Sequence, residues 1–427
     1  MNPMWRKALR LLLAVFLMTA LLPLPAMHAY ADAAIITDAV QHPGTRINLF
    51  DYWVTEKQTD SDDLPVKDYP KTLEQGINGP LGESGPATQL KFAKNMGHKD
   101  NQHLSKIPAN LWTGTAETRT GIVKNMLVDG YPVTRVDNND TGTKITAEQS
   151  LAYLFDPWFE TDGKASYYNV SGLLRQDERG YYYYDCTQNF AEYYKDENGK
   201  NAFKLYKEPG VIKQDKQKGQ FFPFNDFDQV KDLGREDPKI LHYFGLSMIT
   251  RFVQLRDGLA YNGKDHVVYE FSGDDDVWIF IDDVLVADLG GIHDAASLKI
   301  DFATGDISIN DGKDGHYTST LREQFEAAYN ANNISWDATA FRGNTFADDT
   351  YHTMKFFYLE RGNSESNLSL KFNLAEIPET YVYKVDQQGE LVQGAEFALY
   401  AADEHYTIRE KAPICRNTTD ENGKLVF

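Results

Sequence analysis

The stretch that decides the fold runs from Val267 to His293 and reads VVYEFSGDDDVWIFIDDVLVADLGGIH. Its apolar residues form three short runs, at Val267–Phe271, Val277–Ile281 and Val284–Leu289, whose length and β-branched or aromatic content favour strands. Only Asp282-Asp283 separates the last two runs, and aspartate tolerates the left-handed backbone of a two-residue hairpin turn. The stretch therefore predicts one strand followed by a tight hairpin.

Three consecutive acids, Asp274, Asp275 and Asp276, lie between the first two predicted strands. Three like charges repel one another unless a cation shares them, and calcium takes several oxygen ligands from loops of this kind. The alternative is a solvated loop whose first aspartate caps its own backbone. Calcium is therefore the predicted cofactor, with these three residues as candidate ligands.

The second strand of the stretch is apolar on both faces. Because side chains alternate along a strand, Trp278 and Phe280 share one face, and Val277, Ile279 and Ile281 share the other. We therefore expect a central strand that is covered on both sides.

The patterns SGDDDVWIFIDD, DLGGIH and KIDFATGDISI resemble the fibro-slime domain of bacterial and slime-mould extracellular proteins. That domain is related to the lectin module of flocculins and anthrax protective antigen. The segment Tyr351–Phe372 resembles the two closing strands of the same module. The resemblance implies a mainly β fold, a lectin-like antiparallel β-sandwich with an N-terminal extension.

The flocculin lectins imply a calcium ion held by Asp274 and Asp275, joined through a cis peptide bond, with Asp276 as an additional acid. Such lectins complete the site with an asparagine from a second loop, which the sequence does not identify here. His293 and Asp294 follow two glycines and are candidate ligand-binding residues at the same end of the hairpin. The alternative for His293 is a hydrogen-bonded structural histidine.

The end of the chain, from Tyr381, contains YVYKVDQQGELVQGAEFALY and TTDENGKLVF. It resembles the N-terminal half of a SpaA-type prealbumin-like pilin domain, a partial immunoglobulin-like sandwich. In that family the lysine of the K-V-D motif, here Lys384, often forms an isopeptide bond with an asparagine or aspartate on the last strand. Its partner strand is expected beyond Phe427, and a plain edge-strand lysine is the alternative.

The chain begins with basic residues, an apolar run from Leu11 to Leu24 and the small-residue pattern Ala29-Tyr30-Ala31, which together predict a secretory signal peptide. No later stretch is apolar enough to span a bilayer. The expected organisation divides the chain into four parts: a signal (1–31), a β-rich region that either joins the same sandwich or forms a subdomain (32–215), the lectin-like domain (216–376) and the truncated prealbumin-like domain (377–427).

The region before the lectin-like domain contains an aromatic cluster that includes Tyr181–Tyr184. Alternation along one strand favours sheet packing for these rings over a sugar-stacking platform. Two helices are predicted, at Lys144–Leu154 and Leu321–Asn330. The second places Leu321, Phe325 and Ala328 on one face.

The composition limits the function. A formal charge of −20 argues against nucleic acid and anionic membranes as partners. The two cysteines, Cys186 and Cys415, do not make a disulfide framework. No zinc, nucleophile-elbow or phosphate-loop motif is present, so no enzyme is predicted.

The leading interpretation is a secreted or cell-surface adhesin of a Gram-positive bacterium that binds a glycan or matrix component through calcium. A structural pilus or stalk component, with other surface or pilus subunits as partners, is second, and a polysaccharide-acting enzyme is third.

Overall fold

The computed structural model describes most of the chain after the predicted signal. The described residues are 34–52, 122–135, 148, 150–159, 164–212, 217–230, 243–291, 293, 295–310, 315–361, 366–377, 381–400, 402, 407–408 and 411–426. The predicted signal peptide and Asp294 lie outside them. No helix among the described residues is long and apolar enough to cross a membrane.

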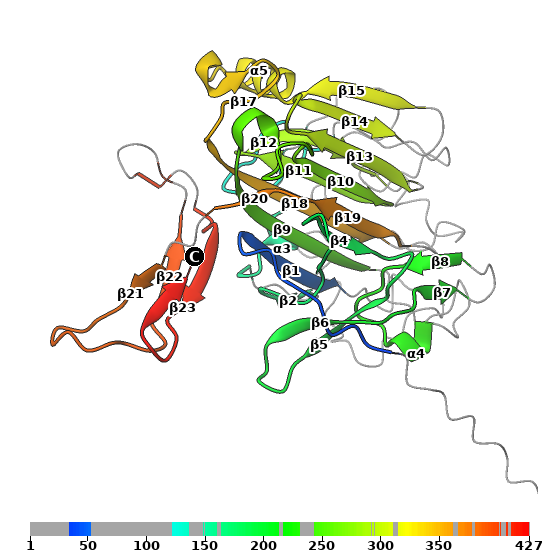
Figure 1. The fold of residues 1–427 in the computed structure, drawn as a ribbon, viewed down its shortest axis with the longest axis vertical. Coiled ribbons are helices and arrows are strands. Elements are labelled where there is room, and N and C mark those ends of the chain that lie inside the picture. The colour runs from blue at the N-terminus through cyan, green and yellow to red at the C-terminus, as the bar shows by residue number, and fades with distance from the viewer. Residues whose placement is uncertain are drawn as a thin grey trace, which may run out of the picture. The chain divides into compact units, whose positions relative to one another are not determined.

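Two seven-stranded antiparallel sheets form the body of the protein (Figure 1). The first sheet contains, in spatial order, β12 (Val284–Leu289), β11 (Asp276–Ile281), β18 (Tyr351–Arg361), β9 (Tyr243–Val253), β1 (Thr45–Tyr52) and β2 (Lys164–Tyr167), with β20 (Ala375–Glu376) also paired to β9. The second contains β15 (His316–Thr320), β14 (Asp306–Asn310), β13 (Ala296–Asp301), β10 (Val268–Gly273), β19 (Leu368–Phe372), β4 (Tyr182–Asp185) and β3 (Arg175–Gln176). The predicted mainly β, antiparallel fold class is confirmed.

Aromatic rings join the two sheets into a sandwich. Phe356 of β18, in the first sheet, lies 5.5 Å from Phe271 and 6.5 Å from Tyr269 of β10, in the second, between ring centroids. Strands from the region before residue 216 occur in both sheets, since β1 and β2 belong to the first and β3 and β4 to the second. That region therefore builds the sandwich together with the segment 216–376.

Strand β11 lies between β12 and β18, and all six of its residues are buried. Trp278 and Phe280 pack on one face with Phe357 and with Phe155 from a preceding segment. The prediction of a central strand that is covered on both sides is confirmed. The Asp282-Asp283 turn also has the expected left-handed backbone, with φ of 46° and 67°.

The helices within the described ranges are α3 (Ala152–Phe155), α4 (Phe227–Val230), α5 (Leu321–Ala331) and two 3-10 turns, η5 (Arg256–Gly258) and η6 (Ala338–Ala340). The predicted second helix is confirmed in α5, which buries Leu321, Phe325 and Ala328. Of the predicted first helix, only 148 and 150–154 are described; Ala152–Leu154 are helical, in α3, whereas Ser150 forms a β-bridge with Val133. Leu151, Leu154 and Phe155 are buried in one core cluster with residues of the first sheet.

Small two-stranded sheets complete the structure: β5 (Ala191–Lys195) with β6 (Asn201–Leu205), β7 (Gly210–Ile212) with β8 (Gln217–Gln220), β16 (Phe341–Arg342) with β17 (Thr345–Phe346), β21 (Tyr381–Tyr383) with β24 (Lys424–Val426), and β22 (Glu396–Leu399) with β23 (Cys415–Thr418). The predicted alternation of Tyr181–Tyr184 holds only within β4, where Tyr182 and Tyr184 are buried and Tyr183 is half-buried; Tyr181 precedes the strand and is buried as well.

Candidate functional site

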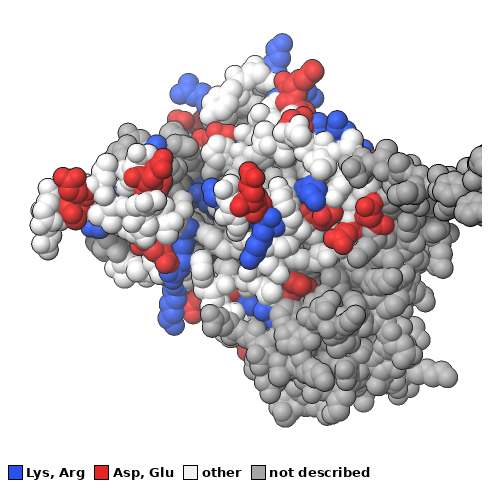
Figure 2. Space-filling model, turned by 90° about the horizontal axis from the view of Figure 1, so that it is seen from below, with Lys and Arg blue, Asp and Glu red and all other residues white. Residues whose placement is uncertain are grey.

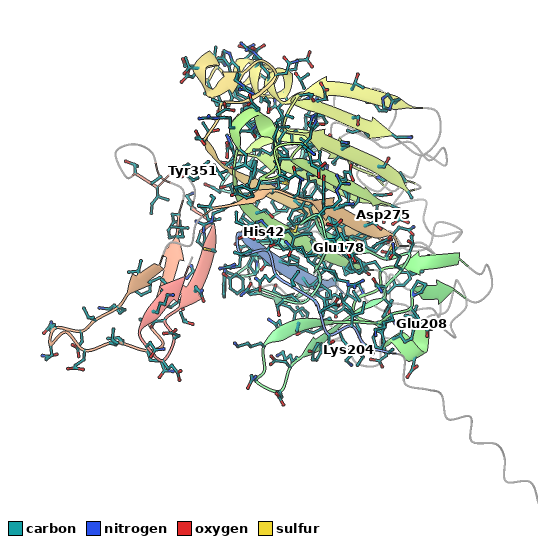
Figure 3. The ribbon with its side chains drawn as sticks, viewed as in Figure 1. His42, Glu178, Lys204, Glu208, Asp275 and Tyr351 are labelled. Atoms are coloured by element: carbon teal, nitrogen blue, oxygen red, sulfur yellow. The ribbon has the colours of Figure 1, made fainter. Side chains whose placement is uncertain are left out.

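The acidic triplet lies where the chain changes sheets. Strand β10 belongs to the second sheet and β11 to the first, and only Asp274 and Asp275 separate them. The chain returns from the first sheet to the second between β18 and β19, and the two connections meet. Asp276 lies opposite Leu359 on β18, and Gly273 lies opposite Leu368 on β19. Figure 3 shows Asp275 at this corner, near the start of β19 and away from Tyr351, which begins β18.

We call this site the acidic crossover and define it as Asp274, Asp275, Asp276, Glu360 and Asn367. The three aspartates are 6%, 3% and 0% exposed, and Glu360 is 0% exposed. Burial of four carboxyl groups at one corner is costly unless protons, hydrogen bonds or a cation compensate their charges. The solvated-loop alternative for the triplet is therefore wrong.

Asn367 holds the Asp274 carboxylate from the neighbouring connection. The Asn367 backbone N–H donates to Oδ1 at 2.5 Å, and its side-chain Nδ2 donates to Oδ2 at 2.8 Å. The sequence did not identify the asparagine of a second loop, and in the structure Asn367 is an asparagine from another connection that contacts the triplet. Its contact with Asp274 spans 93 residues of sequence, so no local pattern reveals it.

Glu360 lies beside Asp275 and carries a perturbed carboxyl group. Burial raises the pKa of the Glu360 carboxyl well above its usual range, and the charges of Asp275 and Asp274 raise it further. A hydrogen bond between the Glu360 and Asp275 side chains favours the protonated form of Glu360 in the same way. The site therefore retains a proton that an exposed glutamate would lose.

The backbone at this corner differs from the one that the flocculin resemblance implies. The described residues contain no cis peptide bond, so the expected cis bond between Asp274 and Asp275 is wrong. Instead, Asp275 adopts a left-handed conformation with φ of 60°. Aspartate tolerates this region better than most residues, and the turn redirects the chain from one sheet to the other.

Gly273 allows the two connections to approach each other closely. A Cβ atom at this position would lie 2.4 Å from the Asn367 carbonyl oxygen and 2.6 Å from the Phe271 ring. No side chain fits in that space without moving the backbone. The glycine thus sets the distance at which Asn367 reaches Asp274.

Asp276 connects the triplet to the loop after β12. Its Oδ1 accepts a 2.6 Å hydrogen bond from the Gly291 backbone N–H. His293, two residues further along, is 4% exposed and its Nε2 lies 2.9 Å from the Leu289 carbonyl oxygen. The loop therefore meets the acidic crossover, but the His293 ring is buried and hydrogen-bonded to its own loop.

Sequence reasoning missed Glu360 as well as Asn367, although Glu360 had a readable signal. Along β18 it follows Phe356 and Tyr358 in strict alternation, which places an acid on the buried face of an apolar strand. Tyr358 donates a 3.1 Å hydrogen bond to Glu360, and its hydroxyl also lies 3.0 Å from the Ser366 hydroxyl. These contacts fix the glutamate next to the triplet.

The donor set suits calcium, but the side chains are arranged as a hydrogen-bonded cluster. Among the described residues, no group of three or more His, Cys, Asp or Glu side chains has an arrangement that could hold a metal ion. Carboxylate and amide oxygens are the ligands that calcium prefers, and Asp274, Asp275 and Asn367 offer both kinds. The residue types therefore suit the predicted cofactor, whereas their arrangement in the structure is that of a hydrogen-bonded cluster.

The predicted isopeptide residue lies in the small C-terminal sheets. Lys384 follows β21, and its Nζ donates a 2.8 Å hydrogen bond to the Val385 carbonyl. Its backbone N–H donates to Gly423, next to β24. In the structure, this lysine therefore contacts backbone carbonyls.

Charge on the visible face of the protein is mixed. Figure 2 shows small groups of acidic and basic side chains alternating over the described part of that face. Such a surface does not have the broad basic patch that nucleic-acid binding uses.

The chain is similar to several psi proteins of Dictyostelium discoideum. It is 30% identical to protein psiD over 160 residues, 37% of this chain and 23% of that protein. It is 29% identical to protein psiF over 230 residues, 53% of this chain and 27% of that protein, and 46% identical to protein psiI over 68 residues, 16% and 8% respectively. The chain thus matches about a quarter or less of the length of these relatives. No family model and no solved structure matches it.

Proposed function

We propose that this protein is a secreted or cell-surface adhesin that attaches to a glycan or matrix component through calcium at the acidic crossover. The observation that carries this proposal is the convergence of four buried carboxyl groups and the Asn367 amide at one corner of a β-sandwich. No catalysis is part of the proposal.

Electrostatics supports a cation at this corner. Without a cation, the cluster keeps a proton on Glu360, whose pKa is raised by burial and by Asp275 and Asp274. A divalent ion would compensate the same buried charges more fully, because it carries two positive charges. Asp274 and Asp275 would supply carboxylate oxygens and Asn367 an amide oxygen. Calcium at such a site binds sugar hydroxyls directly, which suits weak, multivalent attachment.

The resemblance to fibro-slime and flocculin modules, together with the predicted signal peptide, supports an extracellular binding role. The matched psi proteins come from a slime mould, one of the sources of fibro-slime proteins. These similarities concern part of each protein, so the ligand of the whole protein is also a proposal.

A structural role without a ligand is the second candidate, and one observation favours it. Both carboxylate oxygens of Asp274 already accept hydrogen bonds from Asn367. A corner held in this way stabilises the sandwich without a metal ion.

An enzyme that acts on polysaccharides ranks third. A glycosidase needs two carboxyl groups on opposite sides of a sugar, whereas these acids gather at one corner.

Calcium-dependent melting separates the first two candidates. Calcium at 100 times its dissociation constant should stabilise the native chain by about 2.7 kcal/mol, seen as a higher melting temperature than in chelator. The double variant Asp274→Ala/Asp275→Ala should lose this rise. The matched variant Asp348→Ala/Asp349→Ala, another adjacent pair, should keep it.

A glycan array probed with the chain in calcium and in chelator then tests the ligand. Binding is expected in calcium alone. If calcium leaves the melting curve unchanged and no glycan binds, the structural role is the correct one.

A further inference from the structure

A groove with a volume of about 850 Å³ lies on another part of the sandwich. Its walls come from four elements that are distant in sequence: β12, α5, the β14–β15 hairpin and the segment 122–135. None of the acidic-crossover residues lines it. In Figure 1, α5, β14 and β15 lie together at the top of the sandwich. Its volume is within the range of small-ligand sites.

The groove is lined by apolar side chains and by a polar set of residues that we call the rim. Residues 285–287 of β12, together with Ile307 and Ile309 of β14, supply the apolar side chains. The rim carries amide, hydroxyl and charged groups from Lys124, Asn125, Arg135, Asp288, Tyr317, Thr318, Ser319, Gln324 and Asn332. A sugar presents apolar C–H groups on the faces of its ring and hydroxyl groups around its edge. The apolar residues and the polar rim of the groove suit these two kinds of surface.

Several rim groups are available for a ligand. Asn332 Nδ2 donates to Asn125 Oδ1 at 3.1 Å. Among the described residues, this leaves the Asn125 Nδ2 donor and the Asn332 Oδ1 acceptor without a protein partner. Tyr317 is 51% exposed and presents an aromatic ring on which a pyranose can stack.

The two cations of the rim differ in their surroundings. Lys124 Nζ forms a 3.0 Å ion pair with Glu148, which neutralises much of its charge. Arg135 is exposed, and it has no ion pair with any residue in the described part of the chain. An unpaired guanidinium is notable on a chain with a formal charge of −20, and its planar donors suit a carboxylate.

We propose that this groove binds a carboxylated oligosaccharide, with Arg135 contacting the uronic-acid carboxylate, Tyr317 stacking on a ring and the Asn125–Asn332 pair contacting hydroxyls. The inference is independent of the calcium site, because the groove shares no residue with the acidic crossover. A bound peptide is the competing occupant. Its backbone amides would engage the edge of β12 and would not need a carboxylate.

Calorimetry in the presence of chelator tests the proposal. The chain is titrated with tetramers of galacturonate, mannuronate and glucuronate, and with the neutral galactose tetramer. At least one uronate should bind more tightly than the neutral sugar. Arg135→Gln should weaken that binding about 10-fold, because it removes a charge-assisted contact. Tyr317→Ala should weaken both acidic and neutral sugars.

Arg256→Gln is the matched control, because it removes an exposed arginine of η5, outside the groove. It should leave binding unchanged. Equal weakening by both arginine variants, or the absence of binding across the three uronates, would overturn the proposal. Binding that disappears in chelator or in Asp274→Ala/Asp275→Ala but survives Arg135→Gln belongs to the acidic crossover, which rejects the groove and supports the calcium site.

Discussion

The acidic crossover and the Asp282-Asp283 turn contain the same kind of residue and compensate its charge in opposite ways. At the crossover, the carboxylates are buried next to Glu360, another acid, and a proton is retained. At the turn, Asp282 Oδ2 lies 2.6 Å from His352 Nδ1, and Lys355 Nζ donates to Asp283 Oδ1 at 3.0 Å. Both sites use left-handed aspartates, so the backbone does not distinguish them.

The difference follows from where each site lies in the sandwich. The turn joins two neighbouring strands of one sheet, so its side chains reach the adjacent strand β18, which supplies His352 and Lys355. The crossover joins strands of different sheets, so its side chains point into a corner formed by two connections. Adjacent aspartates therefore indicate a candidate cation site when the chain changes sheets between them.

The largest expected effect comes from closing the space at the crossover. Gly273→Ala places a Cβ atom 2.4 Å from the Asn367 carbonyl oxygen. Overpacking of this kind should lower the free energy of unfolding by about 3 kcal/mol, measured by urea denaturation. Gly263→Ala, where a Cβ meets nothing within 4 Å, is the control for added volume, although its φ of 67° carries its own backbone cost. A Gly273→Ala loss no larger than that of Gly263→Ala would contradict the close approach.

A pair of isosteric changes tests the comparison directly. Asp283→Asn removes the carboxylate that pairs with the buried Lys355 ammonium and should cost about 2 kcal/mol, since one partner is partly exposed. Asp275→Asn removes one of the buried negative charges of the crossover and should raise stability in chelator by about 1 kcal/mol. Asparagine tolerates the left-handed backbone at both positions, so the difference reports charge. Losses of equal size at the two positions would show that the sites do not differ as described.

A separate test is the pH dependence of stability. The folded-state pKa of Glu360 is raised, so above the unfolded-state value the unfolded chain has released a proton that the folded chain keeps. Stability should therefore fall as pH rises, by about 1.4 kcal/mol per pH unit between the two pKa values.

Glu360→Gln should reduce that slope when unfolding is measured in chelator from about pH 5 to about pH 8, a window that lies above the usual pKa of glutamate. The Glu360→Gln variant should keep the part of the slope that comes from Asp51, because burial raises the pKa of the Asp51 carboxyl to about 8. An unchanged slope would mean that Glu360 is ionised in the folded protein.

Local patterns predicted the hairpin, the central strand β11 and helix α5, because alternation, a two-residue turn and one apolar helix face are properties of neighbouring residues. The acidic crossover depends on contacts that are distant in sequence. Asn367 reaches Asp274 only because β18 and β19 return to the same corner as β10 and β11. Of the helix predicted at Lys144–Leu154, the described residues include the single turn of α3, and Leu151 and Phe155 are buried there against the first sheet.

The contact between Asp274 and Asn367 also has a mechanical consequence. It joins the two places where the chain passes between the sheets, so sliding one sheet over the other loads both of its hydrogen bonds at once. Bonds loaded together resist a force jointly, whereas bonds at a fraying edge break one after another. A ligand that added bonds at this corner would raise the force at which the sheets separate, so attachment and resistance to pulling would increase together.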